Sequence, residues 1–221
     1  MINNPIFQYL NPIADDWKKS LLKYHINILN NGKNSDNSAP VLSLTTSGVI
    51  VKKDLTFGKT AQNYTEHQIV KENNIVFTPR DFDQTPILVG TSPTYGCISN
   101  LYIIFEGDES LDNRYIVYYL YALKYKFDYF KKLSFGLRYS FNQDQFKDIP
   151  VLVPPLKKQK LIVNYLDLKI NQINQIFINV GLSENYNFKN LPLEQMNFDN
   201  IITTMKRNLI IDYALGKKEV N

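Results

Sequence analysis

The chain has 221 residues, enough for one hydrophobic core with or without an appendage, and its 44% hydrophobic and 21% charged content is that of a globular protein. The formal net charge of +4 and the sequence pI of about 8.9 favour a nucleic-acid partner only weakly. One cysteine excludes an internal disulfide, and the two histidines lie too far apart for a metal motif. The first ten residues do not resemble a signal peptide, and no apolar run approaches the roughly 18 residues of a membrane span. We therefore expect a cytoplasmic protein with no membrane partner.

The first half of the chain predicts short strands joined by turns. Residues 30–39 form a polar, turn-rich segment that is typical of a loop. Short runs rich in Val, Ile, Tyr and Phe follow it. The predicted strands are 41–45 and 49–51, on either side of the turn residues Ser47 and Gly48, and then 68–77, 86–89 and 98–105. Strands of this length and spacing predict a mixed, mostly antiparallel sheet.

The apolar period then changes to that of a helix. Residues 114–132 contain no Gly or Pro, and their apolar side chains recur at every third or fourth position, which predicts an amphipathic helix. Phe135-Gly136 ends this helix, and residues 149–153 are the last predicted strand. Pro154-Pro155 ends that strand because proline has no backbone N–H to donate. The expected fold class is α+β, with packed helices on the sheet, and residues 1–154 form the first domain.

Residues 155–221 predict a C-terminal helical arm. Its apolar side chains recur as in the seam of a coiled coil. The seam consists of Val163, Leu166, Ile170, Ile173, Phe177 and Val180. Gly181 ends this helix, residues 182–197 connect, and a second amphipathic helix spans 198–215, with Met205 and Leu209 on its apolar side and Gly216 after it.

The seam needs a cover, because a lone helix cannot bury an apolar stripe in water. The second helix, another chain, or both must supply it. We interpret the seam, together with Met205 and Leu209, as a dimerisation or assembly surface. A hairpin within one chain, packed on the sheet, is the alternative.

No catalytic constellation stands out in the sequence. There is no Gly-rich phosphate or cofactor loop, and Pro154-Pro155 follows Val153 rather than the Asn or Asp that would bind a base amino group. Asp167-Leu168-Lys169 has the spacing found in some nucleases, but it falls on the expected solvated face of the arm. Cys97 is more simply a buried core residue than a nucleophile. We expect no catalytic residue, no metal and no cofactor.

Binding chemistry is better represented, above all between residues 114 and 138. Six basic residues face a single acidic one, Asp128, and tyrosines are interleaved with them. Lys, Arg and Tyr contact backbone phosphates, and a loop arginine can bind guanine in the major groove. The predicted DNA-binding residues are Lys52, Lys53, Arg80, Lys124, Lys131, Lys132, Arg138 and Tyr139. The alternatives are a solvated helix face and, for Arg80, a local ion pair with Asp81 or Asp83.

The segment around Pro154-Pro155 resembles a known family. Residues 149–156 read Ile-Pro-Val-Leu-Val-Pro-Pro-Leu, and Gln159, Ile162 and residues 165–167 (Tyr-Leu-Asp) follow. This pattern is similar to the junction between a target recognition domain and a conserved helix in the specificity subunits of Type I restriction-modification systems. Residues 206–217 are similar to the end of that helical region. Weaker upstream features agree: Trp17, Gly32, Gly48-Val49-Ile50, Phe135-Gly136 and Arg138.

The resemblance implies a role. Such specificity subunits are non-catalytic: they bind double-stranded DNA and hold the DNA methyltransferase (modification) subunits, which use S-adenosylmethionine, and through them the restriction/translocase subunit. A full subunit has two recognition domains and two helical regions, so this chain resembles a half-subunit that forms a homodimer or pairs with another half to bind a bipartite target. A stand-alone DNA-binding or scaffold protein without an enzyme partner is the alternative. The chain departs from the family at residues 181–197, where the usual single long helix is interrupted, and its target bases cannot be carried over.

Overall fold

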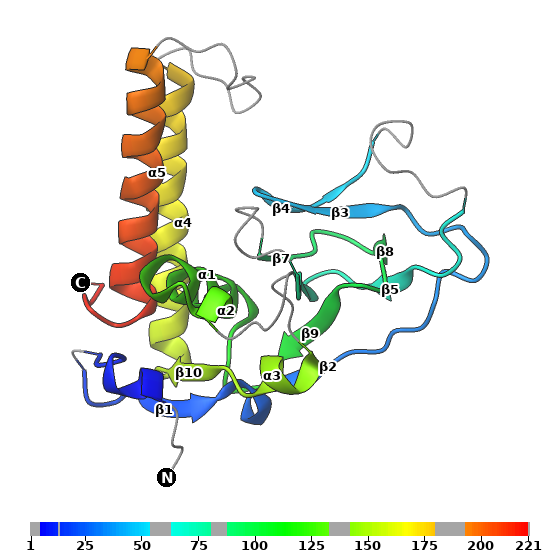
Figure 1. Cartoon of the computed structure of the whole chain (residues 1–221), viewed down its shortest axis with the longest axis horizontal. Helices are drawn as coiled ribbons and strands as arrows, with labels where there is room; N and C mark the ends of the chain where they lie inside the picture. Colours follow the sequence, from blue (N-terminus) through cyan, green and yellow to red (C-terminus); the bar gives the residue numbers. More distant parts are fainter. Residues whose placement is uncertain are drawn as a thin grey trace.

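The computed structural model describes residues 5–12, 14–53, 63–80, 88–132, 142–179 and 193–220. It consists of a lobe of short strands beside a tall hairpin of two helices (Figure 1). The elements in chain order are η1 (Pro5–Gln8), β1 (Lys18–Leu21), η2 (Leu22–Tyr24), β2 (Ile26–Ile28), β3 (Leu42–Thr45), β4 (Gly48–Val51), β5 (Gln68–Val70), β6 (Ile75–Phe77), β7 (Val89–Thr91), β8 (Gly96–Ile98), β9 (Ile103–Gly107), α1 (Asn113–Phe127), α2 (Tyr129–Lys132), α3 (Gln143–Lys147), β10 (Pro150–Val153), α4 (Leu156–Asn179) and α5 (Leu193–Ala214).

Within the described residues, the strands form one four-stranded sheet and three two-stranded ribbons. The sheet has the order β2-β9-β6-β7, and the ribbons pair β1 with β10, β3 with β4 and β5 with β8. All of these pairings are antiparallel, and Val41 and Cys97 add a single parallel bridge. The predicted α+β class with a mostly antiparallel sheet is therefore confirmed.

Two predicted strands are each divided in the structure. The segment 68–77 becomes β5 and β6, because Asn73 adopts a left-handed conformation (φ 64°) that turns the chain between them. The segment 98–105 becomes the end of β8 and the start of β9. Strands β1 and β2 are not among the predicted strands. The Lys18-Lys19 start of β1 is polar, and that strand forms because β10 pairs with it, with Ser20 opposite Val151.

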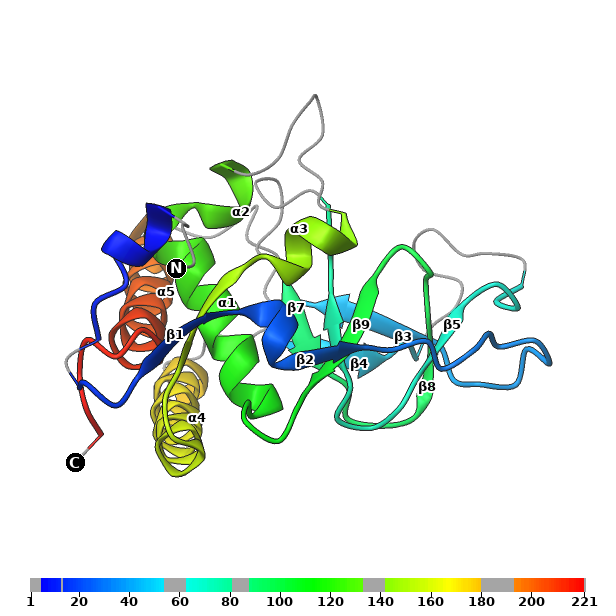
Figure 2. The same cartoon turned by 90° about the horizontal axis from the view of Figure 1, so that it is seen from below.

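Helix α1 begins at a strong cap and is buried along one side. The Asp112 carboxylate accepts hydrogen bonds from the backbone N–H groups of Arg114 and Tyr115. The helix ends at Asp128, whose left-handed conformation (φ 48°) separates α1 from α2, so the predicted single helix over 114–132 is two helices. Figure 2 shows α1 between the hairpin and the four-stranded sheet, and it contacts both.

Several tyrosines of α1 are core residues rather than surface ones. Tyr115 and Tyr119 are fully buried, and their hydroxyls lie within hydrogen-bonding distance of backbone carbonyl oxygens. The Tyr115 hydroxyl lies 3.1 Å from the carbonyl oxygens of both Leu152 and Ala214, and the Tyr119 hydroxyl donates to Pro150 at 3.0 Å. One hydroxyl of α1 thus lies against both the last strand and the end of the second hairpin helix.

The hairpin stands on the same hydrophobic core as the sheet lobe. Ile162 and Leu166 of α4 and Ile210 of α5 belong to the cluster that also contains Trp17 and Phe105. At the Pro154-Pro155 junction, the Gln159 side chain is completely buried. Residues on both sides of the junction therefore share one core at its base, and the division of the chain at residue 154 stays an interpretation of its organisation.

Helix α5 ends with a glycine, as predicted. Gly216 is left-handed (φ 65°), its N–H donates to the carbonyl of Tyr213, and the Lys217 N–H donates to the carbonyl of Asp212, which is the Schellman pattern. The helix begins at Leu193, five residues before the predicted start at 198. Most of the predicted connection 182–197 lies outside the described residues, which resume at Leu193. No described helix is long and apolar enough to cross a membrane.

Candidate nucleic-acid interface

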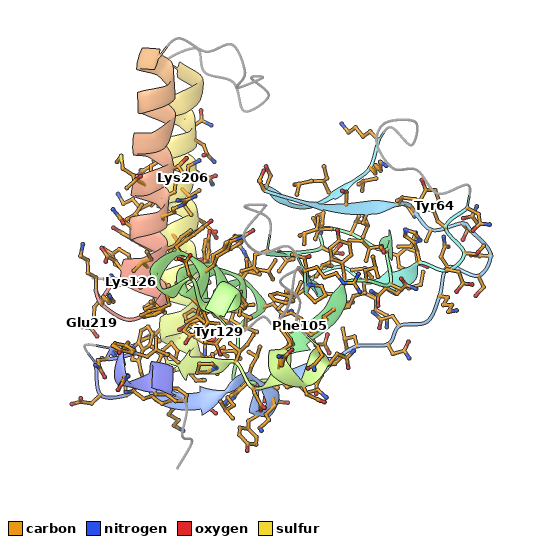
Figure 3. The ribbon with its side chains drawn as sticks, in the orientation of Figure 1. Tyr64, Phe105, Lys126, Tyr129, Lys206 and Glu219 are labelled. Atoms are coloured by element: carbon orange, nitrogen blue, oxygen red, sulfur yellow. The ribbon has the colours of Figure 1, made fainter. Side chains whose placement is uncertain are left out.

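A groove of about 710 Å³ lies where the hairpin meets the sheet lobe. We call it the basic groove. One side is formed by α1 and α5 with part of α4, and the other by β7 and the turn between β3 and β4. Its charged residues are Arg114, Lys206 and Arg207, and none of the described residues that line it is acidic. Figure 3 labels Lys206 on the hairpin, above the level of α1.

Arg207 of α5 packs on an aromatic pair from α1. Its guanidinium carbon lies 5.0 Å from the centre of the Tyr125 ring, and Tyr125 stacks on Tyr121 with centroids 5.5 Å apart. Burial raises the pKa of Tyr125 to about 12, so this phenol is neutral at physiological pH. A guanidinium stacked on a ring keeps its N–H donors at the ring edge available for a planar anion such as phosphate.

Arg114 has a different role, because it is paired. Asp167 of α4 accepts a hydrogen bond from the Arg114 guanidinium and another from the Tyr118 hydroxyl at 2.7 Å. This contact joins α1 to α4 beside the basic groove, which Arg114 and Tyr118 line, and it offsets part of the Arg114 charge. Burial and this carboxylate raise the pKa of Tyr118, so its hydroxyl remains a donor.

The Asp167-Leu168-Lys169 segment has no nuclease geometry in the described part of the chain. Asp167 is held by Arg114 and Tyr118, while Lys169 donates to Gln172 at 3.2 Å. No group of three metal-ligating side chains was found among the described residues. Asp167 thus forms a contact between α1 and α4.

The structure describes only part of the predicted DNA-binding set. Lys52 and Lys53 follow β4 and line a second hollow of about 560 Å³, together with Ser43, Val49, Ile50, Val51 and Pro93. Arg80 is exposed after β6, and its predicted alternative partners, Asp81 and Asp83, lie outside the described residues.

The remaining predicted residues belong to the stretch that follows. Lys124 is half-buried on α1, and Lys131 and Lys132 end α2 with side chains outside the described part. Arg138 and Tyr139 also lie outside the described residues. Lys206 and Arg207 of α5 line the basic groove but are not in the predicted DNA-binding set, because their position there depends on the packing of α5 against α1.

The predicted assembly seam is covered within the chain over most of its described length. Val163, Leu166 and Ile173 are buried, and Ile170 and Leu209 are half-buried against the core. Helices α1 and α5 supply this cover. Met205 is 49% exposed, while the Phe177 side chain and Val180 lie outside the described part. The assignment of these residues to dimerisation stays a prediction.

Cys97 is a core residue, as predicted. It is fully buried, and its sulfur accepts a hydrogen bond from the Asn34 side chain at 3.4 Å. Burial raises the pKa of the thiol, which keeps it protonated and unreactive.

Comparison with known protein families finds a match over most of the chain. Residues 14–184 match the family described as Type I restriction modification DNA specificity domain. No curated protein matches the chain in sequence. The fold is similar to that of the HsdS subunit from Thermoanaerobacter tengcongensis, with a TM-score of 0.52 and 14% identity over 94% of this chain and 47% of that one.

A second solved chain is comparable. It comes from the structure described as "Structural basis underlying complex assembly and conformational transition of the type I R-M system", with a TM-score of 0.51 and 16% identity over 94% of this chain and 48% of that one. The chain thus spans about half the length of these two proteins.

Proposed function

The chain belongs to the family of Type I restriction modification DNA specificity domains, and on that premise we propose that it is a sequence-specific DNA-recognition subunit. The observation that carries the proposal is the extent of the match, which runs from residue 14 through Pro154-Pro155 to residue 184 and so includes both the sheet lobe and α4. The basic groove supports it, because a hollow whose described charged residues are all cationic suits the phosphates of double-stranded DNA.

The proposed partners follow from the same premise. We propose that the chain holds DNA methyltransferase (modification) subunits and, through them, a restriction/translocase subunit, and contributes no catalytic group itself. The chain spans about half of the two solved chains that it resembles, and we propose that it pairs with a second copy or another half-subunit. A two-fold pair of recognition domains would bind a symmetric, interrupted DNA site.

Co-expression with a modification subunit tests this function. The pair is produced in a host without DNA methylation of its own, and methylation-aware sequencing of the host DNA reports the modified motif. We expect an interrupted motif that appears only when both proteins are present. The same methylation from the modification subunit alone, or none from the pair, would contradict the proposal.

Sedimentation analysis tests the assembly separately. The chain is measured alone and with the modification subunit, and we expect a two-fold species in at least one case. A strict monomer in both would refute the pairing. A stand-alone DNA-binding protein would instead bind DNA without co-purifying with a modification subunit.

A further inference from the structure

The ribbon formed by β3 and β4 has one buried face and one exposed face. Its register places Ser43 opposite Ile50 and Leu44 opposite Val49, and side chains alternate between the two faces. Leu42, Leu44 and Val49 are buried in a small core cluster. The outer face therefore carries Ser43, Thr45 and Ile50, and the Ile50 side chain is 45% exposed.

This ribbon is firmly seated on the lobe. A Cβ atom on Gly90 of β7 would lie 2.9 Å from the Cα of Gly48, so the two backbones touch without intervening side chains. At the tip, the Thr45 hydroxyl donates to the carbonyl of Gly48 at 2.9 Å and accepts from the N–H of Ser47 at 3.2 Å. Gly48 takes a positive φ of 101°, which suits glycine. The outer face is thus held in a fixed direction.

Cationic hollows border the ribbon at both ends. The tip, at Thr46 and Ser47, lines the basic groove opposite Arg207, whereas Lys52 and Lys53 line the second hollow at the far end. Val49 and Pro93 line both hollows, and the second hollow also contacts Ser43 and Ile50 of the outer face. None of the described residues that line either hollow is acidic. This positive charge favours a polyanion as the occupant. A protein surface with few acidic residues would not complement it.

The major groove is the DNA surface that best suits sequence recognition by this ribbon. In B-DNA it is about 12 Å wide and admits a two-stranded β-ribbon, and each base pair presents a distinct pattern of donors and acceptors there, whereas the pattern in the minor groove, about 6 Å wide, is degenerate. A serine hydroxyl can bind base edges in the major groove, and an apolar side chain or a threonine methyl group can contact the methyl group of thymine.

We propose that the β3–β4 ribbon enters the major groove of double-stranded DNA and that Ser43, Thr45 and Ile50 face the base edges there. Arg207, stacked on Tyr125, binds a backbone phosphate beside the ribbon. This inference rests on the proposed function, since it names the element that carries out the DNA recognition. It assigns specificity to the ribbon and affinity to the second hairpin helix.

Selection from a random-sequence DNA duplex library tests the ribbon. The parent chain is compared with the double variant Ser43→Ala, Ile50→Ser. The control is Leu101→Ser, which replaces a similarly exposed apolar residue (54%, against 45% for Ile50) outside the ribbon. We expect the double variant to select a changed motif, or to lose at least about fivefold discrimination at one position. Its affinity for non-specific duplex should stay within about twofold of the parent, and Leu101→Ser should behave as the parent.

The same duplexes test Arg207. Arg207→Gln should keep the selected motif, weaken binding to all duplexes, and reduce the slope of log affinity against log salt by about one unit, whereas Arg207→Lys should retain the slope. An unchanged slope in Arg207→Gln would refute the phosphate contact. Circular dichroism confirms that each variant is folded.

The outcomes separate the two proposals. If the parent chain selects no motif, the proposed recognition function fails and the inference fails with it. If the parent selects a motif and the ribbon variant selects the same one with equal discrimination, the ribbon is not the recognition element, although the function stands.

Discussion

Replacing Gln159 by Leu should destabilise the protein strongly, because this side chain connects three segments at the junction. Its Oε1 accepts a hydrogen bond from the Asp112 N–H at 2.7 Å, and its Nε2 donates to the carbonyl oxygens of Ser110 and Pro154 at 2.8 Å each. The side chain is completely buried, so water cannot replace these bonds in the variant.

The magnitude follows from those three contacts. Each hydrogen bond contributes about 1 kcal/mol, and Leu restores none of them, so Gln159→Leu should lower the free energy of unfolding by about 3 kcal/mol. For a chain of this length, that corresponds to a fall in Tm of roughly 6–12 °C. Urea denaturation at constant m-value measures the difference.

The control is Gln175→Leu, an exposed glutamine on the same helix. It makes the same chemical change without breaking a buried contact, and should alter stability by no more than about 0.5 kcal/mol. If Gln159→Leu is as stable as Gln175→Leu, the three hydrogen bonds of Gln159 do not contribute about 3 kcal/mol to stability.

Three further predictions concern stability. Burial lowers the pKa of His25, so as the pH falls the unfolded chain takes up a proton before the folded chain does. The free energy of unfolding should therefore fall as the pH drops below about 6.5. Urea titrations at pH 7.5 and 5.5 should show a smaller fall for His25→Gln than for the parent chain. Gly216→Ala should lower the free energy of unfolding by about 2 kcal/mol, because the φ of Gly216 is positive and the new Cβ would lie 2.7 Å from the Pro12 Cβ. Gly32 also has a positive φ but open space around it, so Gly32→Ala should lower this free energy by about 1 kcal/mol in the same titration. Tyr115→Phe should lower the Tm by a few degrees through loss of about 1 kcal/mol, and an unchanged Tm would mean that its hydroxyl contacts contribute nothing.

The sequence predicted the elements whose signals are local. The β3–β4 ribbon follows from alternating apolar residues around Ser47-Gly48, and the end of α5 follows from Gly216, because turn geometry and helix ends depend on a few adjacent residues. The resemblance to the family could also be recognised from the sequence, because Pro154-Pro155 and Gln159 are part of the sequence pattern that carries it. The structure supplied the reason for Gln159: its amide satisfies three backbone groups at the junction.

Other features depended on contacts between distant segments. Strand β1 forms because β10, more than a hundred residues later, pairs with it. The sequence suggests the tyrosines of α1 as phosphate contacts, but packing against β10 and α5 buries Tyr115 and Tyr119. Local periodicity identifies an apolar face, yet it does not say which segment will cover that face.

The sequence by itself determined a strand-rich lobe, a proline junction and a helical arm with an apolar seam. Only the tertiary structure decided that α5 returns along α4 and packs on α1, which brings Arg207 to Tyr125 and opposite the ribbon tip. The physical reason is that the apolar stripe of a helix requires a cover but does not specify it, so the position of the basic groove depends on the packing of the whole chain.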